Sequence, residues 1–453
     1  MEVTEMKTSF APVGFLLVMF LVSVSCHNNP TGPITTNPAE PRRPAVTSLT
    51  ADYVGVTDAS LRLHMSYNLS GDRFQLRAET TMIDGGRVPP ADTVIHVETL
   101  LPSHSYSYYL TRLSGSGALE ARDTLIFTTM DTTGNNFTWQ FDTLAGQGGA
   151  SYLSDIAVID DSTAYAVGDL FVYDSVGQVQ PTEYNLVKWN GTKWTLQNIE
   201  FDNNGRIAEA SLSTIFSCNS NDIWVGGSDA LHWDGKSWGQ TLLTAGSFNG
   251  RITRFWGTSF TDVYAVGTNG AIAHLLRGWQ SIGSGTTMDF ADLWGTTDSS
   301  TGVQTVYAIA SAGISGGTNL LLQLSNVSAA AVSDSGLQGN VDGIWFPKNG
   351  YAYVVGGGIY RKFGIGSTQP WTPVNLGFAP DSSFKIRGQN INDIFVAGSN
   401  GMILHFNGVS WTNFKPVTGL AGGAYYSVAI DNNLVVAVGL LNQQAIIAIG
   451  RRQ

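Results

Sequence analysis

Charged side chains are scarce in this chain. Asp, Glu, Lys and Arg make up 13% of its 453 residues, about half of the roughly 25% found in ordinary globular proteins. Positive charge is the scarcer kind: 24 Lys and Arg stand against 35 Asp and Glu, a net charge of −11, and no run of Lys or Arg occurs. Binding of nucleic acid or of an anionic membrane surface needs clustered positive charge, so we expect neither as a partner.

Cysteine is almost absent. The chain has only Cys26 and Cys218, and Cys26 lies at the end of a leader segment, so no intramolecular disulfide is expected. A lone cysteine is far more often a small apolar core residue than a nucleophile. No histidine-bearing motif surrounds Cys218, and we therefore predict that it is buried and unreactive.

Motifs of catalysis and of metal binding are lacking as well. The sequence has no H-E-x-x-H and no P-loop. Three of its seven histidines, His232, His274 and His405, stand near the end of a repeated strand, each in a different repeat. Histidines placed in this way cannot converge on one ion at ligand distance. We predict no catalytic residues, no metal and no cofactor.

A long apolar run is missing too, and the run near the start is short. Residues 13–24 are twelve mainly apolar residues, too few to span a bilayer and typical of a signal peptide. They end in Ser23-Val24-Ser25-Cys26, which resembles a bacterial lipobox. The resemblance implies that Cys26 is lipidated and becomes the mature N-terminus. The alternative is an ordinary signal peptide with a nearby cysteine.

A proline-rich segment follows this leader. Residues 27–44 contain five prolines, and such a segment is extended and semi-rigid. We predict a signal peptide over 1–26 and, over 27–44, a tether that holds a folded body away from a membrane. No later run reaches 18 apolar residues, so the lipid anchor is the only membrane attachment expected. The predicted location is the cell envelope, anchored at the outer or plasma membrane, or else secreted.

Residues 45–130 alternate apolar and polar side chains at the period of a β-strand. Within them, Leu100, Pro102 and Tyr106 form the pattern L-x-P-x-x-x-Y, which resembles the penultimate strand of a fibronectin type III domain. The resemblance implies a β-sandwich that serves as a spacer, with the Tyr106 hydroxyl capping nearby backbone. The tryptophan that this family carries in its second strand is missing, and Met65 stands near its place.

From residue 151 onward a short strand motif returns seven times. Its copies end at Gly168, Gly227, Gly267, Ala310, Gly356, Gly398 and Gly439. The first interval is 59 residues and the others are 40 to 46. A third strand and an outer strand that opens with tryptophan follow most copies. Four short antiparallel strands at this period predict the blade of a β-propeller.

The seventh repeat has no tryptophan strand after residues 445–450, whereas residues 137–141 resemble an outer strand and precede the first full repeat. Pairing the two segments removes an open sheet edge, and open edges promote aggregation. We predict that residues 137–144 lie antiparallel beside residues 444–450. The predicted fold is therefore all-β: a sandwich over 45–130, a linker over 131–136 and a seven-bladed propeller over 137–453, closed by its N-terminal strand.

One repeat is especially regular. Residues 256–267 read W-G-T-S-x-x-D-V-Y-A-V-G, which resembles the repeats of bacterial secreted and lipoprotein propellers. The Gly-His partner of the WD40 family is missing, and no S-x-D-x-G-x-x-W box of the sialidases occurs. The resemblance implies the fold and says little about an activity.

The first strand of each repeat alternates polar and apolar side chains, so one set faces the axial channel and the other packs between blades. We predict the channel set by counting back 13 and 11 residues from the end of each strand motif, with allowance for a longer turn in the fourth repeat. In the seventh repeat this count selects Tyr426 and leaves Ser427 on the apolar side. The candidate ligand-binding residues are Arg254, Trp256, Asp292, Trp294, Trp345, Lys385 and Arg387.

These candidates have two interpretations. Tryptophan faces hold sugar rings or other apolar surfaces, and convergent polar groups fix the orientation of a ligand, so the set predicts a binding pocket. In the structural alternative the tryptophans pack between blades, and Arg254 and Asp292 form a salt bridge.

The sequence as a whole predicts a non-catalytic binding module of the bacterial cell envelope, a monomer, whose ligand is a glycan or a protein. A glycan-cleaving enzyme and a purely structural envelope component are the alternatives. Glycoside cleavage needs two carboxylates roughly 5–10 Å apart. The channel set offers Asp155 and Asp292, in the first and fourth repeats, and neither has an evident acid partner.

Overall fold

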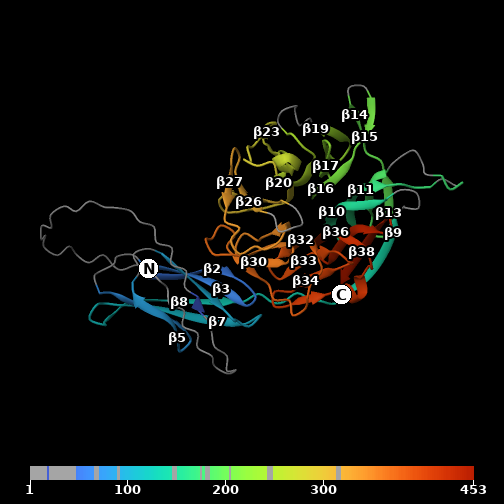
Figure 1. Cartoon of the computed structure of the whole chain (residues 1–453). Helices are drawn as coiled ribbons and strands as arrows, with labels where there is room; N and C mark the ends of the chain where they lie inside the picture. Colours follow the sequence, from blue (N-terminus) through green and yellow to red (C-terminus); the bar gives the residue numbers. More distant parts are fainter. Residues whose placement is uncertain are drawn as a thin grey trace. The chain divides into compact units, whose positions relative to one another are not determined.

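The computed structural model describes ten stretches of the chain: residues 18–19, 47–65, 71–88, 92–144, 150–173, 176–178, 184–203, 206–241, 248–312 and 318–453. They belong to two compact units, Met1–Thr132 and Thr133–Gln453 (Figure 1). Apart from Val18–Met19, the predicted leader with Cys26 and the tether 27–44 lie outside the described residues. Within the stretches given above, no helix is long and apolar enough to cross a membrane.

The first unit contains two four-stranded antiparallel sheets. One has the order β1 (Val18–Met19), β6 (Thr93–Glu98), β3 (Asp58–Met65) and β2 (Thr47–Val54); the other has the order β5 (Thr81–Arg87), β4 (Arg73–Ala78), β7 (Ser105–Leu113) and β8 (Leu119–Thr128). Alternate apolar residues form one core, among them Leu61, Leu76, Ile95 and Tyr108. The period-two alternation of the sequence over 45–130 places these side chains on one face of each strand.

Tyr106 has the role predicted for it. Its hydroxyl accepts a hydrogen bond from the backbone N–H of Leu101 at 2.8 Å, five residues upstream. Met65, predicted near the place of the missing tryptophan, is buried in the core of the same unit. The capping role of Tyr106 is therefore confirmed, while the family of this unit remains a prediction.

The second unit contains, among its described residues, seven four-stranded antiparallel sheets, which we number 1 to 7 in chain order. Sheet 1 consists of β10 (Tyr152–Asp160), β11 (Thr163–Leu170), β12 (Tyr184–Trp189) and β13 (Trp194–Gln197), and sheet 2 of β16 (Leu212–Asn219), β17 (Asp222–Gly227), β18 (Ala230–Trp233) and β19 (Trp238–Thr241). Sheet 3 consists of β20 (Ile252–Ser259), β21 (Asp262–Gly267), β22 (Ile272–Leu275) and β23 (Trp279–Ser281), and sheet 4 of β24 (Phe290–Thr297), β25 (Gln304–Ser311), β26 (Asn319–Leu324) and β27 (Ala329–Val332).

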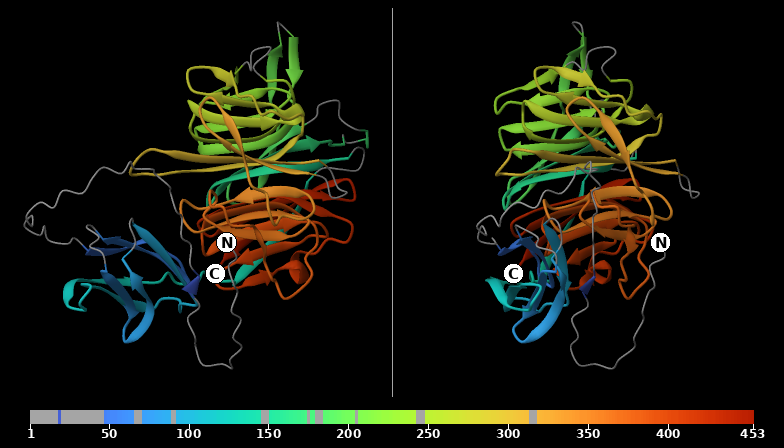
Figure 2. Two further views of the ribbon diagram at one scale, coloured as in Figure 1. Left: turned by 60° about the vertical axis from the view of Figure 1, so that its left-hand side comes forward. Right: turned by 90° about the vertical axis from the view of Figure 1, so that its left-hand side faces the viewer.

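Sheets 5 to 7 have the same plan. Sheet 5 consists of β28 (Val341–Trp345), β29 (Tyr351–Gly356), β30 (Ile359–Phe363) and β31 (Thr372–Pro373), and sheet 6 of β32 (Ser383–Asn390), β33 (Asp393–Gly398), β34 (Ile403–Phe406) and β35 (Trp411–Asn413). Sheet 7 consists of β36 (Ala424–Asp431), β37 (Leu434–Leu441), β38 (Gln444–Arg452) and β9 (Phe137–Leu144). The hairpin of β14 (Glu200–Asn203) and β15 (Arg206–Glu209) projects beyond the sheets (Figures 1 and 2). Two single-turn helices are η1 (Thr268–Gly270) and α1 (Lys415–Thr418).

The first strands of the seven sheets form a ring. Each of them contacts the first strand of the next sheet, and β36 of sheet 7 contacts β10 of sheet 1. The strand motif seen in the sequence is the second strand of every sheet, and in β17 and β33 all six residues are buried. Strands covered on both faces carry continuous rather than alternating apolar residues, which explains why the motif is so uniformly apolar.

The pairing of the two ends of this unit is confirmed. Strand β9 lies antiparallel beside β38, from Leu144 opposite Ala445 to Phe137 opposite Arg452, and Figure 1 shows the two strands side by side. Trp139 faces Gly450, where a Cβ atom would come within 2.9 Å of the indole ring. Gly450 thus makes room for the tryptophan of the closing strand.

Residues just before β9 also bind to the sheets, although the sequence predicts a linker over 131–136. The backbone N–H of Thr133 donates to the carbonyl of Asn407 at 3.3 Å, and the hydroxyl of Thr133 donates to the carbonyl of Asn392. The side-chain oxygen of Asn135 lies 2.5 Å from Nδ1 of His405. The end of the predicted linker is therefore bonded to sheet 6.

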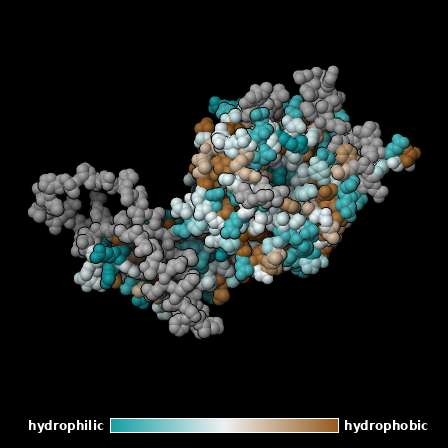
Figure 3. Space-filling model, viewed as in Figure 1, coloured by the Kyte–Doolittle hydropathy of each residue, from teal (hydrophilic) through white to brown (hydrophobic). Residues whose placement is uncertain are grey.

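Large apolar side chains on the surface are scattered. Exposed examples are Ile126, Val176, Phe260, Val327 and Val409, which come from separate segments. The face shown in Figure 3 accordingly mixes hydrophilic and apolar residues. Single exposed apolar residues are normal on protein surfaces, so these residues alone indicate no binding site.

Candidate functional site

Every first strand of the seven sheets carries a β-bulge at the same place. The bulged residues are Ser154, Ser213, Thr253, Ala291, Asp342, Phe384 and Tyr426. A bulge re-aims the side chains beside it. The residues that follow the bulges, which we call the channel positions, are Asp155, Thr214, Arg254, Asp292, Gly343, Lys385 and Ser427.

The prediction for the seventh sheet is wrong by one residue. Tyr426 is the bulged residue, and Ser427 has the channel position, paired with Val438. Sheets such as 2 and 3 have a second register shift near the turn after the first strand, whereas sheet 7 pairs regularly up to Asp431 and Leu434. Because sheet 7 lacks this shift, counting back from Gly439 selects the neighbour of the correct residue.

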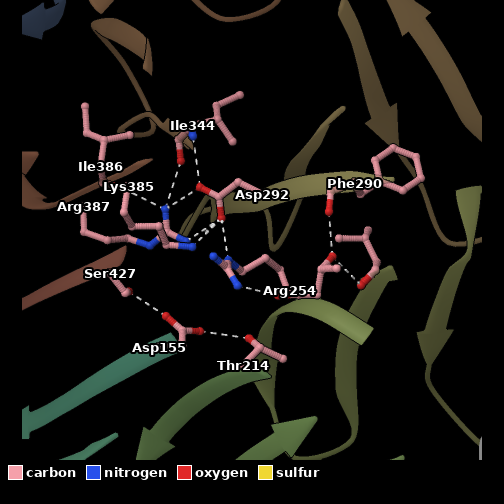
Figure 4. A network of polar contacts seen from close by, with 12 residues as sticks. Asp155, Thr214, Arg254, Phe290, Asp292, Ile344, Lys385, Ile386, Arg387 and Ser427 are labelled. Atoms are coloured by element: carbon pink, nitrogen blue, oxygen red, sulfur yellow. Dashed lines mark hydrogen bonds and ion pairs between the residues drawn. The ribbon is translucent and has the colours of Figure 1, made fainter. Parts of the chain in front are cut away.

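Asp292 is the centre of a buried charge cluster (Figure 4). Its carboxylate is 0% exposed and accepts hydrogen bonds from Lys385 Nζ at 2.7 Å and from both terminal nitrogens of Arg387 at 2.7 and 2.8 Å. The backbone N–H of Ile344 donates to it at 3.0 Å, and Arg254 Nε lies 3.5 Å away. The four charged residues predicted as ligand-binding candidates therefore meet at one carboxylate.

Asp155 is a second buried carboxylate of the ring, and it accepts hydrogen bonds from hydroxyl groups. Thr214 Oγ1 donates at 2.9 Å and Ser427 Oγ at 2.6 Å, and the N–H of Ile215 donates at 3.1 Å. Asp155 and Asp292 each make one contact of the same kind. Each accepts a hydrogen bond from the backbone N–H of the residue that follows the channel position in the next sheet. Both carboxylates thus connect neighbouring first strands.

A cavity of about 190 Å³ lies against this cluster. Arg254 and Arg387 line it together with Asp155, and Trp256 and Trp294 contribute aromatic surface. The Arg387 guanidinium lies 4.9 Å from the centre of the Trp294 ring, a cation–π contact. The arrangement can hold a group with an apolar body against the indoles and hydrogen-bond acceptors toward the guanidinium groups.

The third tryptophan of the predicted set does not line the cavity. Trp345 is 2% exposed and packs in the core, where Gly388 of sheet 6 faces it with no side chain. Trp256 packs in the same way on Gly295 of the next sheet, although it still reaches the cavity. For Trp345 the structural interpretation holds: it packs between sheets.

The ionisation of the cluster is set by burial and by its own charges. Burial alone would raise the pKa of Asp292, but the charges of Arg387 and Lys385 hold that pKa well below its usual range. Burial would likewise raise the pKa of Asp155, but the charges of Arg254 and Lys385 outweigh this effect and the pKa is lowered. Burial, followed by the charges of Arg254 and Arg387, lowers the pKa of Lys385 to about 7. Both carboxylates are ionised at neutral pH, and Lys385 titrates there.

Asp155 and its partners were missed as members of the candidate site. Asp155 has a channel position in the sequence, but the prediction concentrated on the charged and aromatic residues of repeats three to six. The usable signal was the pairing of an acid in one repeat with the hydroxyl residue Thr214 in the next. Ser427, the other partner, was hidden by the register error in sheet 7.

The three noted histidines belong to separate pairs. His232, His274 and His405 lie 2.8, 2.7 and 2.9 Å from an Asp of their own sheet, namely Asp222, Asp262 and Asp393. No group of three potential metal ligands occurs among the residues that the structure describes. The regular spacing of these histidines in the sequence reflects a repeated contact within a sheet.

Cys218 is not buried, contrary to the prediction. It lies at the end of β16 and is exposed, because the strand ends there in a polar turn. Partial desolvation of the thiol and then the charge of Asp222 raise its pKa to about 12. A thiol that stays protonated at neutral pH is a poor nucleophile, so the prediction that Cys218 is unreactive is compatible with its surroundings.

The comparisons with known proteins concern the fold. No family model and no curated protein matches the chain. A solved structure titled "YCF48 bound to D1 peptide" matches with a TM-score of 0.51 and 15% identity, over 70% of this chain and 95% of that one. A second, "Structure of Dos1 propeller", has a TM-score of 0.45 and 9% identity, over 69% and 95%. With the ring of four-stranded sheets, the first likeness confirms the prediction of an all-β protein with a propeller.

Proposed function

We propose that the chain is a non-catalytic binding protein, whose seven sheets are the blades of one propeller and whose ligand inserts a group into the cavity beside the charge cluster. The first unit is then a fibronectin type III-like spacer. The observation that carries the proposal is the cavity itself: fixed guanidinium groups lie beside aromatic walls at the centre of the ring. Convergent polar groups in a largely apolar hollow are the usual mark of a binding site.

Binding is favoured over cleavage by the state of the two carboxylates. A glycosidase needs one carboxyl group with a raised pKa to protonate the leaving oxygen. The pKa values of Asp155 and Asp292 are both lowered, and both carboxylates are occupied by donors from neighbouring strands. Neither is equipped to act as that general acid.

The size of the cavity favours a protein ligand. Sites that enclose a whole small molecule measure about 300–1,000 Å³, and this cavity measures about 190 Å³. It therefore suits one side chain of a larger partner whose main part lies outside. The solved structure with a similar fold is, by its title, bound to a peptide, which agrees with this choice.

The test is a variant that fills the cavity. Ala157 lines it and carries no charge, so Ala157→Leu removes space without removing charge. Peptides selected from a displayed random library on the whole protein should bind this variant about tenfold more weakly or worse, because overpacking costs roughly 1–3 kcal/mol. Affinities are measured by fluorescence anisotropy.

Ala330→Leu is the matched control, since Ala330 is exposed on the outer strand β27. It should bind the peptides as the unchanged protein does. Equal binding by all three proteins would refute a role for the cavity. Selection of sugars on a glycan array, with no peptide selected and with the same loss in Ala157→Leu, would replace the protein ligand by a glycan.

We also propose that the protein is displayed on the cell envelope through a lipid on Cys26, supported by the short apolar run and the lipobox-like residues before that cysteine. Growth with a clickable fatty-acid analogue should label the protein, and Cys26→Ser should be unlabelled and released. Cys218→Ser, which leaves the leader unchanged, should still be labelled. Equal labelling of Cys26→Ser would eliminate the anchor.

A further inference from the structure

Arg254 differs from Arg387 in how much of its hydrogen-bonding capacity is used. Arg387 donates to both oxygens of Asp292 and to the carbonyls of Ile344 and Ile386. Arg254 makes one hydrogen bond, from Nη1 to the carbonyl of Thr253 at 2.6 Å. Its buried Nε–H has no hydrogen-bond partner, because Asp292 lies 3.5 Å away. Arg254 is the guanidinium of the cavity with donors to spare.

The charge of the cavity lining has a definite sign. Two guanidinium groups, Arg254 and Arg387, stand against one carboxylate, Asp155. That carboxylate already accepts three hydrogen bonds, and Arg387 is committed to Asp292. With Asp292 counted, Arg254 and Arg387 balance the two carboxylates, and protonated Lys385 makes the charge of these five groups positive. An incoming carboxylate would find its donors on Arg254, in the charge-assisted geometry that arginine forms with carboxylates.

We infer that the cavity is a carboxylate-binding site, in which Arg254 donates to an acidic side chain of the partner and the protonated form of Lys385 compensates the added charge. The inference rests on the proposed function and names the chemical class of the inserted group. The apolar part of the acidic side chain would lie against Trp294, whose ring is held by a hydrogen bond from its Nε1–H to the carbonyl of Phe346 at 2.9 Å.

Lys385 supplies the compensating charge because of what surrounds it. It is 1% exposed on β32 and faces Asp292 from β24, Asp155 from β10 and Arg254 from β20, beside Arg387 of its own strand. Asp342 of β28 lies near the same carboxylate, and burial followed by the charge of Asp292 raises its pKa to about 6. Between pH 7 and 9, Lys385 is therefore the group of this cluster that changes charge.

Binding of a carboxylate is thereby linked to the uptake of a proton. A bound anion raises the pKa of Lys385, so the complex takes up a proton from solvent onto Lys385 Nζ. The sign follows: affinity is higher at pH 7 than at pH 9. For a rise of one pKa unit, the ratio of the two affinities is about five.

The experiment uses propionate as the probe and propionamide as its uncharged isostere, in ligand-observed NMR titrations of the whole protein. Propionate should bind and propionamide should not. Arg254→Gln should weaken propionate about tenfold or more, Arg254→Lys should have an intermediate effect, and Arg277→Gln, exposed in the same sheet, should have none. The fivefold loss between pH 7 and 9 should vanish in Lys385→Met.

Thermal melts show whether each variant is folded. Should Lys385→Met not fold, proton uptake by the unchanged protein on adding propionate, read with an indicator dye in weak buffer, tests the same link, and zero uptake overturns it. Equal binding of propionate and propionamide, or full binding by a folded Arg254→Gln, overturns the carboxylate site. If the selected peptides still lose affinity in Ala157→Leu, the proposed function stands without this inference.

Discussion

Replacing Asp292 with asparagine should destabilise the protein by about 3–5 kcal/mol, the cost of breaking a buried ion pair by removing one partner. Asp292 is 0% exposed and receives Lys385 and Arg387 at 2.7 Å. Asparagine keeps the shape and loses the charge, so Arg387 is left without its counter-ion. Lys385, whose pKa is raised by the charge of Asp292, loses its proton at pH 7 and stays buried as an amine without its carboxylate partner. The free energy of unfolding, from chemical denaturation at pH 7, measures the loss.

Two comparisons sharpen this prediction. Asp298→Asn breaks an ion pair with Lys348 at the surface, and its unfolding midpoint should stay unchanged within error because exposed pairs contribute little. The double variant Asp292→Asn with Lys385→Met removes the buried amine that has lost its carboxylate partner and should recover part of the loss. A single Asp292→Asn variant as stable as the unchanged protein would contradict the central role given to this carboxylate.

The difference in stability between the unchanged protein and Asp292→Asn should depend on pH, and the direction of this dependence can be predicted. The pKa of Asp292 is lowered in the folded protein by Arg387 and Lys385, against the effect of burial. The stabilisation from its ionised form is therefore complete above the ordinary pKa of an aspartate and is lost as the pH falls through the folded pKa. The unchanged protein and Asp292→Asn should become more alike in stability as the solution is acidified.

Much of the fold could be predicted because each repeat has the same pattern of apolar and polar residues. Each second strand is covered on both faces, so its apolar run recurs, and β9 could be assigned to sheet 7 because that repeat had no outer strand. The register within a first strand was harder. The turn between β36 and β37 lacks the second bulge of sheets 2 and 3, and one residue of difference exchanges Tyr426 for Ser427.

The roles of the three channel tryptophans could not be separated by their position in the repeat. Trp256 and Trp345 each face a glycine of the next sheet, Gly295 and Gly388, which leaves room for the indole to pack there. The residue at the equivalent place opposite Trp294 is Phe346, whose carbonyl instead accepts a hydrogen bond from the indole. Trp294 therefore stays half-buried at the cavity, for a reason that lies in the neighbouring repeat.

Which cations of the charge cluster donate hydrogen bonds to Asp292 could not be predicted from the sequence either. The alternation placed Arg254, Asp292, Lys385 and Arg387 in the channel, and a salt bridge between Arg254 and Asp292 was the structural alternative. In the structure the salt bridge between Arg254 and Asp292 is present at 3.5 Å, but the hydrogen bonds to the two oxygens of Asp292 come from Arg387 and Lys385. The spacing gives the strand positions of these residues and not the distances between their charged atoms.

The closing strand should have the largest effect on the stability of the second unit. Strand β9 provides eight residues that pair with β38, and the rings of Phe137 and Trp139 pack on Phe414 at 5.6 and 5.2 Å. Deleting residues 137–144 removes these rings and exposes the edge of β38. The two rings are half-buried, and losing a large aromatic side chain from a core costs about 3–5 kcal/mol. For a unit of this size that corresponds to a fall of about 4–7 °C in the thermal midpoint, to which the lost backbone pairing adds.

The exposed edge should also change solubility. An unpaired strand such as β38, whose residues 445–449 are all buried in the closed ring, offers its backbone to other chains. Light scattering during heating should therefore begin earlier for the deletion than for the unchanged protein. Phe137→Ala with Trp139→Ala keeps the backbone pairing, so it should lower the midpoint with less aggregation. Deleting eight residues from the tether 27–44 should do neither, and a 137–144 deletion that melts like this control would show that the ring is stable without its closing strand.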